Sequence, residues 1–432
     1  TGRGQIQMIA WLLISFFVLL FLGVPIAMSL GLSAMGGILF LGGGSTVTIA
    51  QRMFEGMNSF ALLAIPLYTF AGFTMSKGGI SKRLMDFCYS IVGHIYGGLA
   101  HVNVLSSMIF AGISGSAVAD TAGVSGMFMP EMVRKGYSKN FTVAVTAISS
   151  TIGIIIPPSI PMVVIAGICG ISTGKLFLGG IIPGVLCGLA QMIVSYFMAK
   201  KEGVPKEPGH FTIGPVLHGL WESWPALLMP IIIVGTITMG IVSPTEAGVI
   251  AVVYGLFAGG IIYRELKWED IKFAFAETVR TSGRIFIVIG AAKLYTVMLT
   301  TAGFDKWVAK TMLGFSTNPT VILIVILLIF FIVTMFMESI ATLTLFMPIL
   351  YPIALGVGIN PIVLSVLITV VIGVGLVTPP VGMCIYVACD LMDVTVGEVF
   401  PTLVPFIAAT FVCIALMVAF PQLILLPTYL MA

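Results

Sequence analysis

"GIIIPPSIPM" (153–162) returns 222 residues later as "GLVTPPVGM" (375–383), with the glycine and both prolines in the same places. Each Pro-Pro pair lies inside a long apolar stretch. Proline lacks an N–H donor and blocks the i to i−4 hydrogen bond, so each pair predicts a break in a helix. Backbone carbonyls freed in this way are tolerated at membrane depth only where they are buried in protein or line a cavity.

The composition around these breaks is typical of a helical membrane protein. Hydrophobic residues make up 59% of the chain and charged residues 9%, against about 45–50% and 25% in soluble domains. Apolar windows long enough to cross a bilayer recur from end to end. The net charge of +3 gives no reason to expect nucleic acid as a partner. The six cysteines lie in apolar surroundings without metal-ligand spacing.

Three further matches precede the Pro-Pro pair in each repeat, in the same order and at nearly the same shift. They are "FMP" at 128–130 and 346–348, "GISKRL" at 79–84 echoed by "GFDKWV" at 303–308, and Pro25 matched by Pro244. The chain is therefore predicted to hold two repeats, 1–205 and 206–432. The polar stretch 200–222 joins them.

The basic residues predict how these repeats lie in a membrane. If 103–133 and 320–356 are hairpins that enter and leave on one side, each repeat crosses five times and the two run in opposite directions. Most Lys and Arg residues then fall on the inner face, and the N-terminus lies outside. Inverted repeats with broken helices at matching places are the recurrent design of secondary transporters.

The predicted elements have the same order in both repeats. The first has scaffold helices within 6–76, an interfacial arm 81–98, the hairpin 103–133, a broken helix 140–169 and a helix 176–199. The second has scaffold helices within 226–302, an arm 305–317, the hairpin 320–356, a broken helix 361–391 and a helix 402–426. The stretch 268–284 is interpreted as an amphipathic helix on the inner surface, ahead of a crossing at 282–302.

Each hairpin carries small or hydroxyl residues and an acid. In "GISGSAVADTAG" (112–123) a shift of 218 residues, the shift of the "FMP" match, sets Ser116 opposite Thr334 and Asp120 opposite Glu338. Hydroxyls, carbonyls and helix ends close to a broken helix suit a hard cation such as sodium. Two roles are open for Asp120 and Glu338: capping of the outgoing hairpin helix, or a direct ionic or proton-coupling role. "SPTEAGV" (243–249) predicts a helix start, with Ser243 as N-cap and Glu246 completing a capping box.

The motifs "GISGSAVADTAG", "IIPPSIPM", "SPTEAGV", "FMESIATLTLFMP" and "GLVTPPVGM" together resemble the large membrane subunit of TRAP (tripartite ATP-independent periplasmic) transporters over essentially the whole chain. The resemblance implies sodium-coupled import of a small organic acid across the bacterial inner membrane by an elevator motion. It also implies two partners, a periplasmic substrate-binding protein and a small four-helix membrane subunit. Sialic acid, C4-dicarboxylates and sugar acids remain open as substrates, and no organic cofactor is implied.

The resemblance also implies one sodium site per repeat, on hairpin-tip and broken-helix oxygens. The matching positions are Ser116, Gly153, Ile156 and Ser159 in the first repeat, and Thr334, Gly375, Thr378 and Val381 in the second. Candidate substrate-binding residues are Ser114, Pro157, Pro158, Ser339, Pro379 and Pro380. The second hairpin departs from the family pattern, because "VTMFMES" (333–339) replaces a small, glycine-like tip.

Two other functions are considered. A stand-alone sodium/dicarboxylate symporter of related architecture would need no binding protein. An intramembrane serine protease would use Ser114 as nucleophile, but such catalysis needs a histidine on a later membrane helix. The later histidines, His210 and His218, lie in the polar joint, so the chain is not expected to be an enzyme. The sequence does not fix the sodium stoichiometry, the oligomeric state, the role of Lys293, or whether the small subunit is a separate chain.

Overall fold

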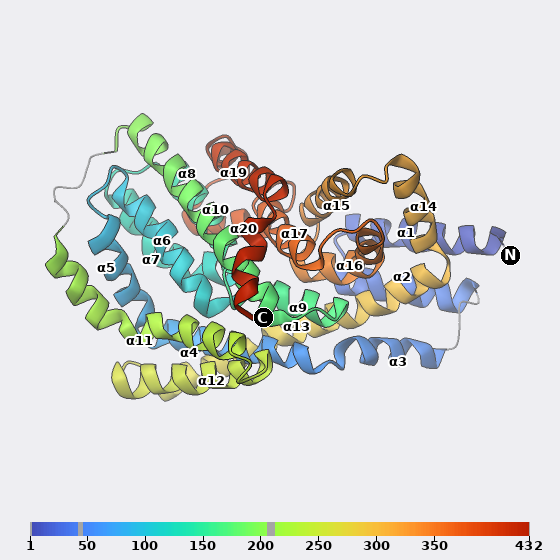
Figure 1. The fold of residues 1–432 in the computed structure, drawn as a ribbon, viewed down its shortest axis with the longest axis horizontal. Helices are drawn as coiled ribbons and strands as arrows, with labels where there is room; N and C mark the ends of the chain where they lie inside the picture. The colour runs from blue at the N-terminus through green and yellow to red at the C-terminus, as the bar shows by residue number, and fades with distance from the viewer. Residues whose placement is uncertain (1, 42–45, 205–211, 432) are drawn as a thin grey trace.

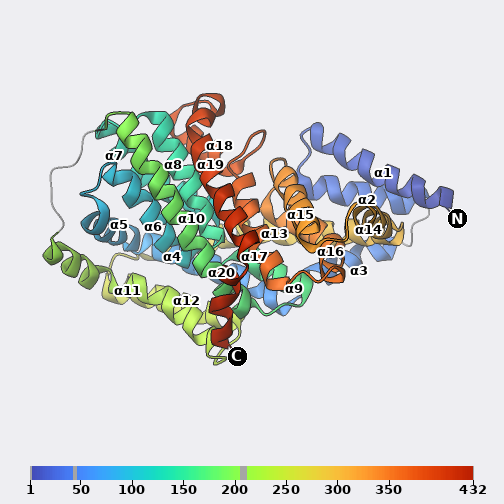
Figure 2. The same cartoon turned by 45° about the horizontal axis from the view of Figure 1, so that its top comes forward.

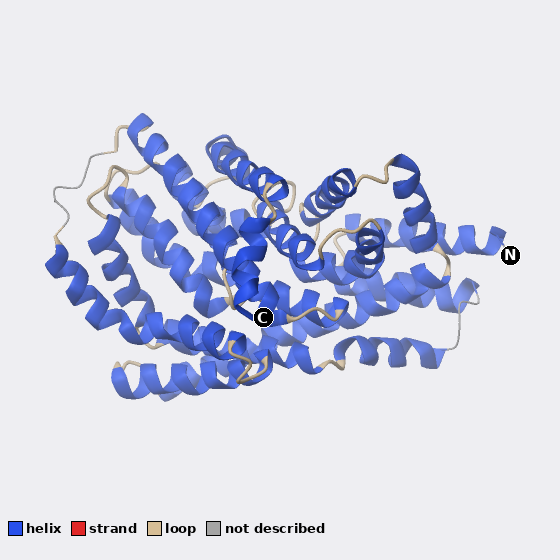
Figure 3. Ribbon diagram, in the orientation of Figure 1, coloured by secondary structure: helices blue, strands red, loops and turns tan. Residues whose placement is uncertain are grey.

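The computed structural model describes residues 2–41, 46–204 and 212–431. The described residues form helices and the turns between them, without strands (Figure 3). Eight of the described helical segments are long and apolar enough to cross a membrane. The expectation of an all-α polytopic membrane protein is therefore confirmed. The predicted boundary between the repeats, at 205 and 206, lies outside the described residues.

In the described part of the first half there are ten α-helices. They are α1 (Gly2–Phe21), α2 (Ile26–Leu41), α3 (Thr46–Met57), α4 (Ala64–Lys77), α5 (Ile80–Val92), α6 (Gly98–Ser114), α7 (Ala117–Arg134), α8 (Lys139–Ser150), α9 (Ile160–Cys169) and α10 (Thr173–Lys201). Two 3-10 turns, Phe60–Leu63 and Thr151–Ile154, precede α4 and follow α8. The expected break within 140–169 is therefore present between α8 and α9.

The second half has a similar order of elements. They are α11 (Ile213–Thr238), α12 (Pro244–Phe257), α13 (Trp268–Thr301), α14 (Phe304–Phe315), α15 (Pro319–Thr334), α16 (Ser339–Gly356), α17 (Pro361–Gly375), α18 (Met383–Met392), α19 (Val396–Ala419) and α20 (Gln422–Leu425). A π-helical turn, Ala258–Ile262, follows α12, and a 3-10 turn, Leu426–Met431, follows α20. Residues 376–382 separate α17 from α18, so this expected break is present too.

Several predicted boundaries are wrong. The stretch 268–284 and the crossing at 282–302 are one helix, α13, because no proline interrupts them. Helix α11 begins at Ile213, inside the stretch assigned to the joint. Helix α19 ends at Ala419, two residues before Pro421, instead of continuing to 426. Helix α3 had not been predicted.

Polar caps fix where the helices begin. Ser243 accepts from the Glu246 N–H (3.3 Å), and the Glu246 carboxylate accepts from the Ser243 N–H (2.6 Å). The predicted capping box of α12 is therefore confirmed. Asn318 and Asn360 cap α15 and α17, each followed by a proline at the first helical position. Such starts need no residue from outside the helix.

The long helices form a frame around the broken ones. Helix α13 packs along α2, α3 and α4, and α4 packs on α12. The Tyr68 hydroxyl donates to the Pro244 carbonyl (2.8 Å), which ties α4 to the start of α12. Figures 1 and 2 show α8, α10, α17 and α19 in the centre, with α6 and α7 on one side and α15 and α16 on the other. The two helical breaks therefore lie in the middle of the molecule.

Candidate functional site

The first hairpin tip touches the first helical break through the backbone. We call this contact, between residues 114–120 and residues 151–160, the first junction. The Ile160 N–H donates to the Gly115 carbonyl (3.2 Å). Gly115 has a φ of 65°, and a methyl group there would lie 2.6 Å from the Pro158 carbonyl oxygen. Glycine is required at this tip because both its backbone conformation and its close approach exclude a side chain.

The second hairpin tip makes the corresponding contact with the second break. We call this contact, between residues 334–339 and residues 374–383, the second junction. The Val381 N–H donates to the Met335 carbonyl (3.0 Å). Gly375 lies against the side chain of Thr334, and a methyl group on Gly375 would lie 2.7 Å from the Thr334 Cβ. In each half, a carbonyl from the hairpin tip thus accepts from an N–H of the broken helix.

The structure corrects the predicted pairing of the two tips. Ser116 is the N-cap of α7, and Glu338 is the N-cap of α16. Thr334 is the last residue of α15, as Ser114 is the last residue of α6. Ser116 therefore corresponds to Glu338, not to Thr334. The reason is that the turn of the second hairpin, Met335–Glu338, is longer than the turn of the first, Gly115–Ser116, so one shift cannot align both arms.

The two hairpin acids have different surroundings. The Glu338 carboxylate accepts from the Ile340 N–H (3.0 Å), the Ala341 N–H (3.3 Å) and the Ser339 hydroxyl (2.8 Å). The capping role is therefore confirmed for Glu338. Helix α7 is capped by Ser116, which accepts from the Ala119 N–H (3.4 Å). Capping is therefore the wrong interpretation for Asp120, whose Oδ1 accepts a hydrogen bond from the Ser114 hydroxyl.

Three of the hydroxyls expected at the sodium sites, on Ser159, Thr334 and Thr378, donate to backbone carbonyls four or five residues earlier in the chain. Ser159 donates to the Ile154 carbonyl and caps α9 by accepting from the Met162 N–H (3.3 Å). Thr334 donates to the Phe330 carbonyl (2.6 Å), and Thr378 donates to the Val374 carbonyl (2.7 Å). Because a hydroxyl has two acceptor lone pairs, each oxygen can still contact a cation.

The other expected sodium ligands could contribute only backbone oxygens. Gly153 and Gly375 have no side chain. The Ile156 side chain packs against Gly184 of α10, where a methyl group would lie 2.3 Å from the Ile156 Cγ1. Val381 is 40% exposed and carries only an aliphatic side chain.

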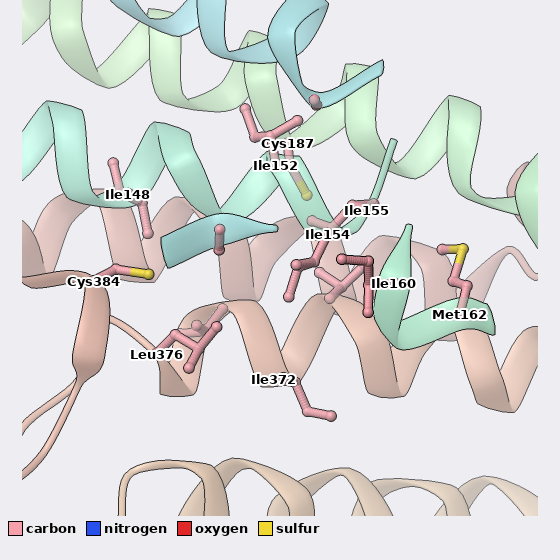
Figure 4. Close-up of a cluster of buried hydrophobic side chains, with 14 of the residues drawn as sticks. Ile148, Ile152, Ile154, Ile155, Ile160, Met162, Cys187, Ile372, Leu376 and Cys384 are labelled. Atoms are coloured by element: carbon pink, nitrogen blue, oxygen red, sulfur yellow. The ribbon is translucent and has the colours of Figure 1, made fainter. Parts of the chain in front are cut away.

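The two breaks meet in an apolar cluster (Figure 4). Ile152, Ile154 and Ile155 of the first break lie beside Ile372 and Leu376 of the second. A methyl group on Gly373 would lie 3.3 Å from the Thr151 Cβ, so α17 packs directly on the turn after α8. This packing excludes water around the breaks, and polar interactions are stronger in such surroundings than in water.

A hollow of about 470 Å³ lies where the start of α7 faces the start of α18. It is lined by Val118, Pro380, Val381, Met383, Tyr386 and Val387. A second hollow of about 440 Å³ shares Tyr386. The Tyr386 hydroxyl donates to the Pro380 carbonyl (3.1 Å), which links α18 to the Pro-Pro pair before it. Volumes of this size suit small-molecule ligands.

Of the six expected substrate-binding residues, Pro380 alone lines the first hollow. Ser114, Pro157 and Pro158 are buried at the first junction, and Ser339 is buried beside Glu338. The sequence interpretation missed Val118 of α7 and the face of α18 made by Met383, Tyr386 and Val387. These α18 residues follow the Pro-Pro pair at helical spacing, so projecting the helix from the break would have found them.

The chain is similar in sequence to a family of known proteins. Residues 13–423 match the family described as "Tripartite ATP-independent periplasmic transporter, DctM component". The chain is 35% identical to the sialic acid TRAP transporter large permease protein SiaM of Vibrio cholerae, over 94% of this chain and 95% of that protein. It is also 35% identical to the C4-dicarboxylate TRAP transporter large permease protein DctM of Pseudomonas aeruginosa, over 93% and 94% of the two chains.

A third relative is longer than this chain. The isethionate TRAP transporter permease protein DctMQ of Oleidesulfovibrio alaskensis is 37% identical over 91% of this chain, which spans 62% of that protein's length. Among solved structures, the YdaH transporter of Alcanivorax borkumensis shares the fold, with a TM-score of 0.57, 12% identity and coverage of 87% and 88% of the two chains. MtrF of Neisseria gonorrhoeae gives a TM-score of 0.54 at 14% identity, with coverage of 87% and 84%.

The family consists of transporters, so the Ser114 protease interpretation is wrong and the chain is not an enzyme. In the structure the Ser114 hydroxyl donates to a carboxylate, not to a histidine. With the family matched across nearly all of its length, this multi-pass membrane protein belongs to the DctM components, the large permease subunits, of the tripartite ATP-independent periplasmic transporters.

Proposed function

We propose that the chain is the sodium-coupled transport subunit that imports a small organic acid across a bacterial inner membrane. A periplasmic substrate-binding protein delivers the acid, and a small four-helix membrane subunit braces the permease. The N-terminus faces the periplasm, and the two halves lie in the membrane with inverted topology. Sodium is the coupling ion, and no organic cofactor takes part.

The observation that carries this proposal is the pair of junctions. Each brings a hairpin tip to a helical break through one backbone hydrogen bond, Gly115 to Ile160 and Met335 to Val381. Each leaves hydroxyl and carbonyl oxygens at a break, and the buried Ser159 and Thr378 lie at the first and second breaks. Oxygen ligands of this kind at broken helices are how secondary transporters hold sodium.

The packing also supports an elevator motion. Helix α9 packs on α16, and α18 packs on α7, so each broken helix contacts the hairpin of the other half. The two hairpins and two broken helices therefore form one connected unit. Helices α3, α4, α12 and α13 form the frame beside it. In our proposal the connected unit moves against this frame and carries the substrate and sodium with it.

The relatives support an anionic substrate. Their names specify sialic acid, C4-dicarboxylate, isethionate and 2,3-diketo-L-gulonate, which are all small organic anions. We place the substrate of this chain in the hollow between α7 and α18, next to both junctions.

The test is reconstitution of the chain in liposomes, with and without a small TRAP membrane subunit and a periplasmic binding protein sought in the reading frames beside its gene. Labelled sialic acid, succinate, isethionate and diketogulonate are offered under an inward sodium gradient. We expect one of them to accumulate only when sodium and the binding protein are both present. Accumulation by the chain without a binding protein would instead establish the stand-alone symporter. Equal uptake in potassium would refute sodium coupling.

A further inference from the structure

The buried acid of the first junction has one oxygen without a partner. Asp120 is fully buried, and its Oδ1 accepts from the Ser114 hydroxyl. Its Oδ2 has no hydrogen-bond partner. Buried polar groups in proteins normally have hydrogen-bond partners, and a buried charge requires a partner. The free oxygen therefore needs an explanation that the hairpin itself does not supply.

The position of the Asp120 Oδ2 next to Gly153 suggests what its partner is. A methyl group on Gly153 would lie 2.0 Å from Oδ2 and 3.6 Å from the carbonyl carbon of Ser116. Oδ2 thus points at the surface of Gly153, next to the backbone of Ser116, and both residues belong to the first proposed sodium position. Ser114 acts as a positioning residue, because its hydrogen bond to Oδ1 holds the carboxylate in this orientation.

At the second junction no carboxylate oxygen faces the glycine of the break. A methyl group on Gly375, the counterpart of Gly153, would lie 2.7 Å from the Thr334 Cβ and 3.0 Å from its Cγ2. The only acid nearby on the hairpin, Glu338, already accepts three hydrogen bonds at the start of α16. The glycine that faces a carboxylate oxygen in the first half therefore faces an aliphatic carbon in the second.

We propose that Asp120 is a cation ligand of the first junction only, so that the two junctions hold sodium unequally. The first position combines a carboxylate oxygen directed at the break with neutral oxygens, whereas at the second position the only hairpin acid, Glu338, is engaged at the start of α16. At short range in a poorly solvated site, a carboxylate binds a cation far more strongly than a carbonyl dipole does. This inference rests on the proposed sodium coupling and adds a difference in affinity between the two positions.

The test measures sodium binding without transport. The purified complex of permease and small subunit is titrated with sodium chloride at constant ionic strength with choline, following sodium-dependent thermal stabilisation and bound ²²Na. Asp120→Asn keeps the acceptor for Ser114 and the side-chain volume but removes the charge. We expect the tighter component of the titration to weaken by at least about tenfold, and the weaker component to be unchanged.

Gly153→Ala tests the same position without a change of charge, in case Asp120→Asn fails to fold. Its methyl group occupies the space in front of Oδ2, so we expect it to weaken the same component. The matched control is Gly126→Ala, also in the first half, where a methyl group meets nothing within 4 Å.

Three results would overturn the inference. If neither variant shifts the tighter component, Asp120 is not a ligand. If Asp120→Asn weakens both components equally, Asp120 does not make the two sodium positions different. If the unmodified complex shows no sodium-dependent stabilisation or ²²Na binding, the proposed sodium coupling fails, and this inference fails with it.

Discussion

The two junctions have the same backbone arrangement but different side chains. In both, a carbonyl of the hairpin tip accepts from an N–H that closely follows the Pro-Pro pair, and a glycine before that pair packs against the hairpin. The acids differ, because Asp120 faces the break whereas Glu338 caps its own helix. The comparison teaches that a repeated break fixes backbone geometry, while the role of each side chain depends on the exact length of the turn.

The largest expected effect comes from breaking the backbone contact at one tip. Gly115→Val places a branched side chain at a φ of 65° and against the Pro158 carbonyl. We expect loss of sodium-driven uptake and destabilisation of about 1–3 kcal/mol. Uptake in proteoliposomes and thermal unfolding check this. Unchanged uptake would show that the tip does not need to meet the break.

The next effect concerns the second junction. Thr378→Ala removes a hydroxyl oxygen next to the second break, so we expect the sodium concentration for half-maximal uptake to rise about tenfold. Thr378→Ser keeps the hydroxyl and serves as the control. The sodium dependence of initial uptake rates is the measurement. If the alanine and serine variants behave alike, the hydroxyl is not a ligand.

A smaller effect on stability is expected when the N-caps of the two hairpin helices, Glu338 and Ser116, are removed. Glu338→Ala removes three accepted hydrogen bonds at the start of α16, and loss of a cap costs about 1 kcal/mol. We expect a lower melting temperature with sodium affinity unchanged within about twofold. Ser116→Ala removes the cap of α7 together with a proposed sodium ligand, so both quantities should fall. A loss of sodium affinity in Glu338→Ala would contradict the difference between the junctions.

The smallest effect is at the hollow. Val381 donates its N–H to Met335, and its side chain lines the hollow. Val381→Ala should therefore change the substrate concentration for half-maximal uptake by about fourfold, on the scale of one buried methyl group, because the side chain is 40% exposed. Its sodium dependence should stay the same. A shift in the sodium dependence alone would place the substrate elsewhere.

Much of the fold could be predicted from the sequence because prolines and long apolar windows act locally. The Pro-Pro pairs located both breaks, and Ser243 with Glu246 located the start of α12. The joint was less predictable. Helix α11 begins within its polar stretch at Ile213, and its first residues are exposed.

The candidate site was predicted less completely. Counting from the "FMP" match paired Ser116 with Thr334, because nothing in the sequence shows that the second turn is two residues longer. The different surroundings of Asp120 and Glu338 could not be predicted either, since both follow a hydroxyl-bearing residue by four positions. Tyr386 and its neighbours on α18 could have been found by projecting the helix from the Pro-Pro pair, but their place opposite α7 depends on the tertiary fold.

The most direct test of the account is a high-resolution electron cryomicroscopy map of the permease and its small subunit in lipid nanodiscs, recorded in sodium and again in choline. We predict density between hairpin tip and break at both junctions in sodium, with Asp120 contacting only the first, and neither density in choline. Maps without sodium-dependent density at either junction, or with a helix running unbroken through 151–160, would contradict it.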